Sequence, residues 1–300
     1  MSQSVAAISR NPATGEELAR YPFATAEALE ASLQAAQRGF EQWREVAPAE
    51  RAKILRRMAA ALRENADALA RMTSIEMGMP ITQALAEVEK CAALCEWYAD
   101  HGPALLADEK TTVEGDKAYI AYLPLGPVLA VMPWNFPLWQ VMRGAVPIIL
   151  GGNAYVLKHA PNVMGCAYLL AKTWAQSGLP AGVFEVINVT PELVSRAIAD
   201  PRIASVAVTG SVGAGAAIAA QAGAALKKCV LELGGSDPFI VLADADLEAA
   251  VKAATIGRFQ NGGQICIAAK RIILEAPIAE AFTERFVAAV RALQVGDPQD

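Results

Sequence analysis

The stretch VLAVMPWNFPLWQVMRGAVPIILGGNAYVLK, from Val128 to Lys158, decides the fold that we predict for this chain. It begins with the apolar run VLAVM (128–132), continues with the helix-prone run LWQVMRGAVPIIL (138–150) and ends with the apolar run AYVLK (154–158). Continuous apolar strands that alternate with helices are typical of a parallel sheet buried on both faces. The stretch therefore predicts a strand-helix-strand unit of an α/β protein.

The same alternation continues towards the C-terminus. The further segments are a helix VMGCAYLLAKTWAQSG (163–178), a strand FEVIN (184–188), a short helix after Pro191, a strand SVAV (205–208), a helix from about Gly213 and a strand CVLEL (229–233). This rhythm predicts a doubly wound parallel sheet. Such sheets bind ligands at the carboxyl ends of their strands.

Helical segments precede this core. The run PAERAKILRRMAAALRENADALARMTSIEM (48–77) predicts one amphipathic helix, and ITQALAEVEKCAALCEWYAD (81–100) predicts a second. Cys91 and Cys95 lie four residues apart on the second helix, where we interpret them as small apolar residues of a helix interface. The run TTVEGDKAYIAYL (111–123) predicts a hairpin that interrupts the helical region and is a candidate for subunit contact.

A second α/β unit is expected after Gly234-Gly235. It comprises a strand PFIVL (238–242), a helix ADLEAAVKAATIGRFQ (245–260) and the loop GRFQNGGQICIAAKR (257–271). A last helix, PIAEAFTERFVAAVRAL (277–293), leads into the polar end VGDPQD. This is a poor place to finish a domain, so we expect the chain to be truncated at its C-terminus.

Composition narrows the class of protein. With 300 residues, 54% of them hydrophobic, the chain is long enough for two domains. A net charge of -5 gives no basic footprint for nucleic acid or an anionic membrane. The first residues lack a secretory pattern and no apolar stretch has membrane-spanning length, so we expect a cytoplasmic protein. Five cysteines without C-x-x-C spacing suit a reducing compartment, and two histidines leave little scope for a zinc site or a histidine-based triad.

Four side chains lie where the predicted sheets would bind a ligand. Cys266 ends a glycine-loosened loop, Glu232 ends an apolar strand, Asn135 lies between two prolines after the first strand, and Lys158 closes the second strand. These residues suit a nucleophile, a general base, an oxyanion donor and a contact to ribose or phosphate. Burial of Glu232 would make it more basic. The structural alternatives are a buried filler, a solvated carboxylate, an amide that satisfies a turn and a surface lysine.

A glycine-rich strand-helix junction is a weaker candidate. The segment TGSVGAG (209–215) offers backbone N–H groups and a helix N-terminus to a pyrophosphate, but it lacks the dinucleotide and P-loop fingerprints. Its glycines alternatively allow close helix packing.

Taken together, five motifs resemble the NAD(P)-dependent aldehyde dehydrogenase superfamily. They are PWNFP (133–137), VLK (156–158), TGSVGAG (209–215), LELGG (231–235) and FQNGGQIC (259–266), in this order, and the resemblance runs from about residue 8 to the last residue. It implies that Cys266 is the nucleophile, Glu232 the general base and Asn135 the oxyanion donor. The implied reaction adds the thiolate to an aldehyde, transfers hydride to the nicotinamide and hydrolyses a thioester.

The resemblance also implies a cofactor site and its two domains. Lys158 would lie near the adenosine ribose; the pyrophosphate side would hold Gly210, Ser211 and Gly215; the nicotinamide half would hold Trp134 and Leu233. Pro161 stands where strongly NAD-selective members often carry a glutamate, so we expect use of both NAD and NADP. The expected domains are residues 1–110 and 126–230 for dinucleotide binding, 111–125 for an oligomerisation hairpin, and 231–300 for the first part of the catalytic domain.

Arg143 and its neighbourhood indicate the substrate. Succinate-semialdehyde dehydrogenases are similar in having arginine at this position, where many relatives have an aromatic residue, and a guanidinium there would bind a distal carboxylate. The segments KHAPNVMGCA (158–167) and KKCVLELGGSDPFIVL (227–242) resemble the bacterial Sad-type branch of these enzymes. Alternatively, Arg143 caps a strand or pairs with an acidic residue. The rival functions are oxidation of an aromatic or uncharged aldehyde, and a non-catalytic scaffold. A homodimer or homotetramer is expected.

Overall fold

A five-stranded parallel sheet forms the centre of the computed structural model, which describes residues 6–113 and 118–300. Its spatial order is β7-β6-β5-β8-β9, so the chain builds outward from β5 in one direction and then returns to build in the other. The strands are β5 (Val128–Val131), β6 (Tyr155–Lys158), β7 (Phe184–Val186), β8 (Ser205–Gly210) and β9 (Lys228–Leu233). The predicted doubly wound sheet is confirmed.

Side chains along each strand alternate between two cores, one on each face of the sheet. Ala130 and Leu157 belong to the larger core, whereas Leu129, Val156 and Val206 belong to the smaller one. Since successive side chains of a strand point to opposite faces, a strand buried on both faces must be apolar at every position. The continuous apolar runs in the sequence have this cause.

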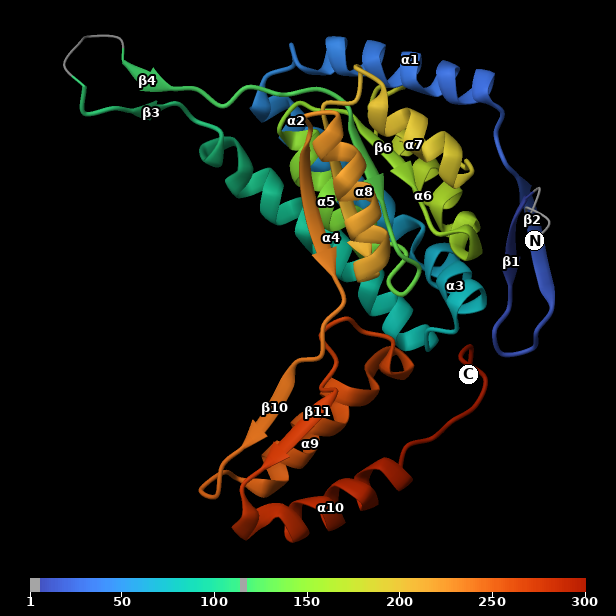
Figure 1. The fold of residues 1–300 in the computed structure, drawn as a ribbon, viewed down its shortest axis with the longest axis vertical. Helices are drawn as coiled ribbons and strands as arrows, with labels where there is room; N and C mark the ends of the chain where they lie inside the picture. The colour runs from blue at the N-terminus through green and yellow to red at the C-terminus, as the bar shows by residue number, and fades with distance from the viewer. Residues whose placement is uncertain (1–5, 114–117) are drawn as a thin grey trace.

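Helices cover both faces (Figure 1). The larger core lies under α5 (Trp139–Leu150) and α6 (Met164–Gln176), with an outer layer formed by α2 (Pro48–Glu64), α3 (Ala66–Met77) and α4 (Ile81–Leu105). The smaller core lies under α1 (Ala26–Trp43), α7 (Pro191–Ala199) and α8 (Val212–Ala224). Cys91 and Cys95 are buried in the larger core, as predicted for small apolar residues.

The single helix predicted over residues 48–77 is wrong. Asn65 separates α2 from α3 with backbone angles of φ -101° and ψ 13°. Its side-chain nitrogen donates to the Ala61 carbonyl at 2.7 Å and to Gln176 Oε1 at 2.8 Å. A short amide that bonds to the backbone competes with helical hydrogen bonding and here ends the helix.

Charged side chains of the outer layer cap both central helices, and three of them, Glu87, Glu76 and Arg51, are buried. Glu87 accepts two N–H groups at the start of α5, and Glu76 accepts two at the start of α6. At the other ends, Arg51 donates to the Leu150 carbonyl of α5, and Arg57 donates to a carbonyl just after α6. Carboxylates at N-termini and guanidinium groups at C-termini satisfy unpaired backbone groups and complement the helix dipoles.

Two short antiparallel pairs accompany the sheet. β1 (Ala6–Arg10) pairs with β2 (Glu17–Pro22); neither strand, nor α1, was predicted from the sequence. In the predicted hairpin, β3 (Glu109–Lys110) pairs with β4 (Tyr119–Ile120), so pairing begins before residue 111. The Glu-Gly-Asp turn expected in this hairpin lies outside the described residues.

The second α/β unit follows the sheet and lies beyond its carboxyl edge (Figure 1). β10 (Pro238–Val241) and β11 (Arg271–Leu274) are parallel, and they pack with α9 (Leu247–Phe259) and α10 (Ala279–Arg291) around a small core of their own. β9 pairs with β8 as far as Leu233, so the domain boundary expected after residue 230 falls within a strand of the sheet. The C-terminal segment returns to the first unit, where the Ile81 N–H donates to the Pro298 carbonyl at 2.7 Å.

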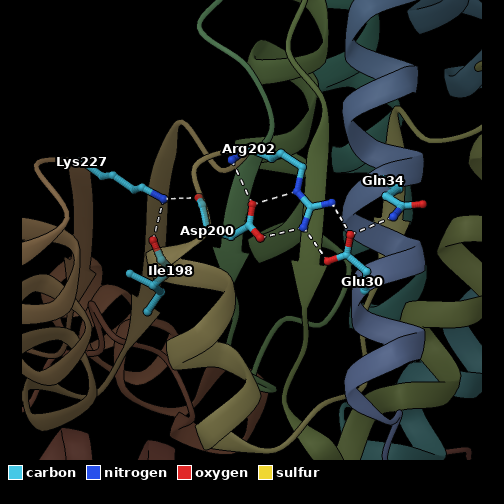
Figure 2. A network of polar contacts seen from close by, with 6 residues as sticks. All are labelled: Glu30, Gln34, Ile198, Asp200, Arg202 and Lys227. Carbon is cyan, nitrogen blue, oxygen red and sulfur yellow. Dashed lines mark hydrogen bonds and ion pairs between the residues drawn. The ribbon is translucent and has the colours of Figure 1, made fainter.

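An ion-pair network holds α1 against the loop that precedes β8 (Figure 2). Arg202 donates to both carboxylate oxygens of Glu30, at 2.8 and 2.7 Å, and to both oxygens of Asp200, at 2.8 and 2.7 Å. Gln34 also donates to Glu30, and Lys227 donates to the carbonyl groups of Ile198 and Asp200. The network links elements that are far apart in the sequence.

Candidate active site

A cavity opens at the carboxyl ends of the strands, where the direction of sheet building reverses between β5 and β8. Its volume is about 420 Å³. Pro133 and Trp134 follow β5, and Thr209 and Gly210 end β8 on the other side of the reversal. The crevice at such a switch point is the usual ligand site of open α/β sheets, because loops from neighbouring strands diverge there.

Eight of the predicted site residues line this cavity. They are Trp134, Asn135, Arg143, Gly210, Ser211, Glu232, Leu233 and Cys266. Cys266 comes from the second unit, Arg143 comes from α5, and the others come from the loops and strand ends of the sheet. The structure therefore brings together three groups that are separated by long stretches of chain: the thiol, the carboxylate of Glu232 and the amide of Asn135.

Three predicted site residues lie outside the cavity lining. Lys158 ends β6 and pairs in register with Val131 of β5, so it lies at the same edge of the sheet, one strand away. Burial lowers the pKa of its ammonium group. Pro161 follows it in the next loop. Gly215 is buried in α8, where an added Cβ would lie 2.4 Å from the Leu233 side chain, so the glycine makes room for a cavity residue.

The Asn135 side chain is oriented by the Cys266 loop. Its Nδ2 donates to the Gln264 carbonyl at 2.8 Å. An amide nitrogen carries two hydrogens, so one N–H remains for a ligand in the cavity. This bond fixes the amide before any ligand binds, which is a property of pre-organised hydrogen-bond donors.

His159 supports the segment that contains Asn135 through contacts with backbone groups. It is buried, and its Nε2 lies 2.9 Å from the Pro137 carbonyl while its Nδ1 accepts the Ala160 N–H at 3.0 Å. Burial lowers its pKa to about 4. Its Nδ1 also lies 3.3 Å from the Met132 carbonyl. These contacts with the backbone make His159 a structural residue of the loop.

Cys266 lies on a loop that reverses direction through left-handed backbone. Asn261, Gly262 and Gly263 have φ values of 51°, 62° and 80°. Glycine adopts this region without strain, and asparagine is among the residues that tolerate it best. Cys266 is half-buried, so its sulfur is neither sealed in the core nor fully solvated.

The cations that follow Cys266 in the sequence bind backbone groups. Lys270 Nζ donates to the carbonyl groups of Gly235 and Cys266, and Arg271 Nε donates to the Ser236 carbonyl at 2.9 Å. These bonds tie the Cys266 loop to the linker that follows β9. Lys270 and Arg271 therefore help to hold the Cys266 loop in place.

Glu232 is exposed, which is the solvated alternative considered for it from the sequence. Its side chain is 59% exposed, because β9 is the last strand of the sheet and its outer positions are open. Glu232 Oε2 lies 3.3 Å from Arg143 Nη2, which also donates to Thr209 Oγ1 at 3.3 Å. Arg143 is thus paired with an acidic residue, the alternative weighed against substrate binding.

Some residues of the site were not found from the sequence. Asn261 and Gln264 contact Asn135 directly, and Gln140 and Thr209 line the cavity. Their residue types are ordinary in loops and helices, and only the spacing Asn261-x-x-Gln264 before Cys266 offered a signal. Among the described residues, no three His, Cys, Asp or Glu side chains are grouped as a metal site requires. Within the same residues, no helix has the length and apolar character needed to cross a membrane.

Known proteins share this architecture and much of this sequence. The sequence matches the aldehyde dehydrogenase family over residues 2–300. It is 63% identical over 294 residues to succinate semialdehyde dehydrogenase [NAD(P)+] Sad of Escherichia coli, covering 98% of this chain and 64% of that protein. It is 47% identical to a probable succinate-semialdehyde dehydrogenase [NADP(+)] of Synechocystis, covering 96% of this chain and 63% of that one.

A solved structure gives the same picture. The succinic semialdehyde dehydrogenase of Streptococcus pyogenes, in complex with NADP+, superposes with a TM-score of 0.95 at 35% identity, covering 98% of this chain and 65% of that chain. The chain thus spans 63–65% of the length of these relatives, slightly less than two thirds. By its sequence over nearly all its residues and by its fold, the chain belongs to the aldehyde dehydrogenase family.

Proposed function

We propose that this protein oxidises a short aldehyde with a distal carboxylate, succinate semialdehyde, to the acid with NAD or NADP. The observation that carries the proposal is that Cys266, Glu232 and Asn135 line one cavity at the switch point of the sheet. The names of the two succinate-semialdehyde dehydrogenases compared above agree with this substrate and these cofactors.

The residues at the sheet edge fit a dinucleotide. Ser211 is the N-cap of α8, and its side chain accepts the Ala214 N–H at 3.2 Å. Space is open around Gly210 and Gly213, so the exposed first turn of α8 is accessible to a pyrophosphate, which a helix N-terminus favours. Lys158 would contact the ribose, and Trp134 and Leu233 would flank the nicotinamide, whose role when bound is to accept a hydride.

The proposed reaction uses the three cavity groups in sequence. The Cys266 thiolate attacks the aldehyde carbon and forms a C–S bond, while the Asn135 amide and the Cys266 backbone N–H hold the oxyanion. Loss of hydride from this adduct leaves a thioester on Cys266. Glu232 then removes a proton from water, which attacks the thioester and releases the acid and the thiolate. The exposed position of Glu232 gives it access to water.

A cysteine pair tests the nucleophile. We expect Cys266→Ser to lower NAD(P)H formation at least about a thousandfold, because a serine hydroxyl is far less ionised and nucleophilic at neutral pH. Cys229→Ser, in a half-buried cysteine outside the cavity, is the matched control and should retain the activity. Full activity of Cys266→Ser would exclude Cys266 as the nucleophile. A folded wild type without aldehyde oxidation would favour the scaffold alternative.

Arg143 is proposed to bind the substrate carboxylate. Its guanidinium lines the cavity, where an incoming carboxylate would compete with Glu232. Arg143→Gln should reduce the preference for succinate semialdehyde over butanal by about tenfold to a hundredfold, since a charge-assisted hydrogen bond is lost for one substrate alone. The ratio of kcat/KM values isolates this effect from any effect on Glu232, which serves both substrates. An unchanged ratio would support the rival with an uncharged or aromatic aldehyde.

The assembly and domains complete the proposal. We propose that the sheet unit binds the dinucleotide, that the second unit begins a catalytic domain, and that the β3-β4 hairpin joins subunits of a cytoplasmic homodimer or homotetramer. Exposed apolar side chains on this hairpin, including Tyr119, Ile120 and Leu123, support the subunit contact. Sedimentation of the wild type and of a variant with Ile120→Lys and Leu123→Lys tests it, because the charges should favour the monomer.

A further inference from the structure

A closed ring of three hydrogen bonds joins the segment of Asn135 to the loop of Cys266. Asn261 Nδ2 donates to the Asn135 carbonyl at 2.6 Å, Asn135 Nδ2 donates to the Gln264 carbonyl at 2.8 Å, and the Gln264 N–H donates to the Asn261 carbonyl at 3.1 Å. Each of the three residues is bonded to the other two. Neither segment can move against the other without breaking a bond of this ring.

Asn261 is the most constrained member of the ring. It is fully buried, its φ of 51° lies in the left-handed region, and the Gln264 side chain also donates to its carbonyl at 3.1 Å. Its side-chain oxygen is buried without a hydrogen-bond partner among the described residues. A buried asparagine with an unpaired side-chain oxygen and a left-handed backbone lowers the stability of the fold. We expect such a residue only where the hydrogen bonds that it does make are needed. The bond to the Asn135 carbonyl is the contact that links it to the cavity.

Helix α4 anchors the ring from outside the cavity. Gln83 Oε1 accepts the Asn261 N–H at 2.8 Å. One turn later, Glu87 Oε1 accepts the N–H groups of Leu138 and Trp139, at 3.0 and 2.7 Å, just after the Asn135 segment. Residues four apart lie on the same face of a helix, so one face of α4 holds both segments. Gln83 and Asn261 are not among the described residues that line the cavity.

We propose that Gln83 and Asn261 are positioning residues that set the Asn135 amide relative to the Cys266 sulfur. The inference rests on the proposed roles of Cys266 as nucleophile and Asn135 as oxyanion donor. One N–H of the Asn135 amide is held by Gln264, so the position of the ring fixes where the other N–H points. A displacement of about 1 Å in such a donor can cost on the order of a hundredfold in rate.

Two reactions of the same thiol separate donor position from thiol reactivity. With p-nitrophenyl acetate, the Cys266 thiolate attacks the ester carbonyl, a tetrahedral oxyanion forms, and p-nitrophenolate leaves as the acetyl thioester remains. With iodoacetamide, the thiolate displaces iodide from carbon, and no oxyanion forms. Single-turnover rates of both reactions are to be measured in the whole natural protein. The variants are Gln83→Leu, which removes the acceptor, Gln83→Glu, which keeps it, and Asn261→Gly, which keeps the left-handed backbone but removes the amide.

We expect Gln83→Leu and Asn261→Gly to slow acylation at least about tenfold, since the oxyanion donor is displaced, while alkylation stays within about threefold of the wild type. Gln83→Glu should restore acylation, because its carboxylate accepts the same N–H. Unchanged acylation in both disruptive variants, or a parallel fall of alkylation, would overturn the proposal. The acylation-to-alkylation ratio does not depend on aldehyde oxidation, so a wild type that oxidises no aldehyde would count against the proposed function alone.

Discussion

Glu87 shows how one buried carboxylate supports the site. Its Oε1 accepts two N–H groups at the start of α5, and its Oε2 is buried without a hydrogen-bond partner among the described residues. Burial raises its pKa to about 7, although the bonds to Trp139 and Leu138 and the charge of Lys90 act in the opposite direction. Desolvation therefore outweighs the favourable helix-terminus contacts in this position.

The raised pKa of Glu87 predicts a pH dependence of stability. Between about pH 4.5 and pH 7 the folded protein binds the proton more tightly than the unfolded chain, so the free energy of unfolding falls as the pH rises through this window. Glu87→Gln keeps a carbonyl oxygen for the two N–H groups and cannot ionise. We expect it to gain stability relative to the wild type between pH 5 and pH 8, by up to roughly 3 kcal/mol.

Urea unfolding of both proteins at the two pH values measures this effect. The matched control is Glu64→Gln, in an exposed glutamate of α2, whose curve should follow the wild type. Parallel pH curves for Glu87→Gln and the wild type would show that the Glu87 carboxylate stays ionised throughout this range.

At the scale of elements, α1 is fitted to the sheet by a contact between two glycines. An added Cβ at Gly39 of α1 would lie 2.5 Å from the backbone carbon of Gly182, and Gly182 itself has a φ of 85°. Backbone cannot yield as a flexible side chain can, so only glycine permits this approach. The contact holds α1 against the loop that leads into β7.

We predict that Gly39→Ala destabilises the protein by about 1–3 kcal/mol, because overpacking forces α1 away from the loop. Gly223→Ala on α8 is the control, since its Cβ would meet open space. Replacing a helical glycine there should leave stability unchanged or raise it by less than about 1 kcal/mol. Thermal unfolding of the three proteins decides the matter; equal losses from both substitutions would argue against a specific contact.

The Arg202 network should give α1 an acid-sensitive attachment. The hydrogen bonds from Arg202 lower the pKa of Glu30 to about 2. A lowered pKa stabilises the folded state above the unfolded value near 4.5, and this stabilisation disappears as the pH falls through the folded value. Arg202→Gln should therefore weaken the protein at pH 6 and have a smaller effect at pH 2.5.

The midpoint of urea unfolding at both pH values checks this expectation. Arg38→Gln, in an exposed arginine of the same helix α1, serves as the comparison and should change little. A loss of stability in Arg202→Gln that is as large at pH 2.5 as at pH 6 would mean that charge at Glu30 is not its source.

At the scale of the whole molecule, the cavity exists only because two units meet. Asn135 and Glu232 come with the sheet, and Cys266 comes with the second unit, whose core is separate. The units are linked through the ring around Asn261 and through the contact of Ile81 with Pro298. Ligand binding at the edge of the sheet should therefore stabilise the assembled molecule.

A cofactor that binds only the folded protein should raise its stability by mass action. At a concentration of about 100 times its Kd, NADP+ is expected to add about 2.7 kcal/mol to the free energy of unfolding. Pro161→Glu should reduce this gain for NADP+ and keep it for NAD+, because a carboxylate repels a 2'-phosphate and accepts from a 2'-hydroxyl. Unfolding curves with each cofactor test this, and equal gains for NADP+ in both proteins would place the 2'-phosphate away from residue 161.

The sequence by itself determined the strands of the central sheet, most of the helices and most of the predicted residues that line the cavity. Apolar runs such as 128–132 and 154–158 carry this information locally, because a strand buried on both faces must be apolar throughout. The same local patterns did not reveal the break at Asn65, where a side chain competes with the helix, or the N-terminal elements.

Only the tertiary structure decided how the site is held. Asn135 meets Gln264 across 129 residues, Gln83 meets Asn261 across 178, and Arg143 pairs with Glu232 on a strand that proved exposed. A hydrogen bond between distant segments does not change the sequence pattern of either segment. It depends instead on how the whole chain folds. The sequence therefore indicated eight residues that line the cavity, whereas the hydrogen bonds that orient Asn135 depend on the packing of the sheet, α4 and the second unit.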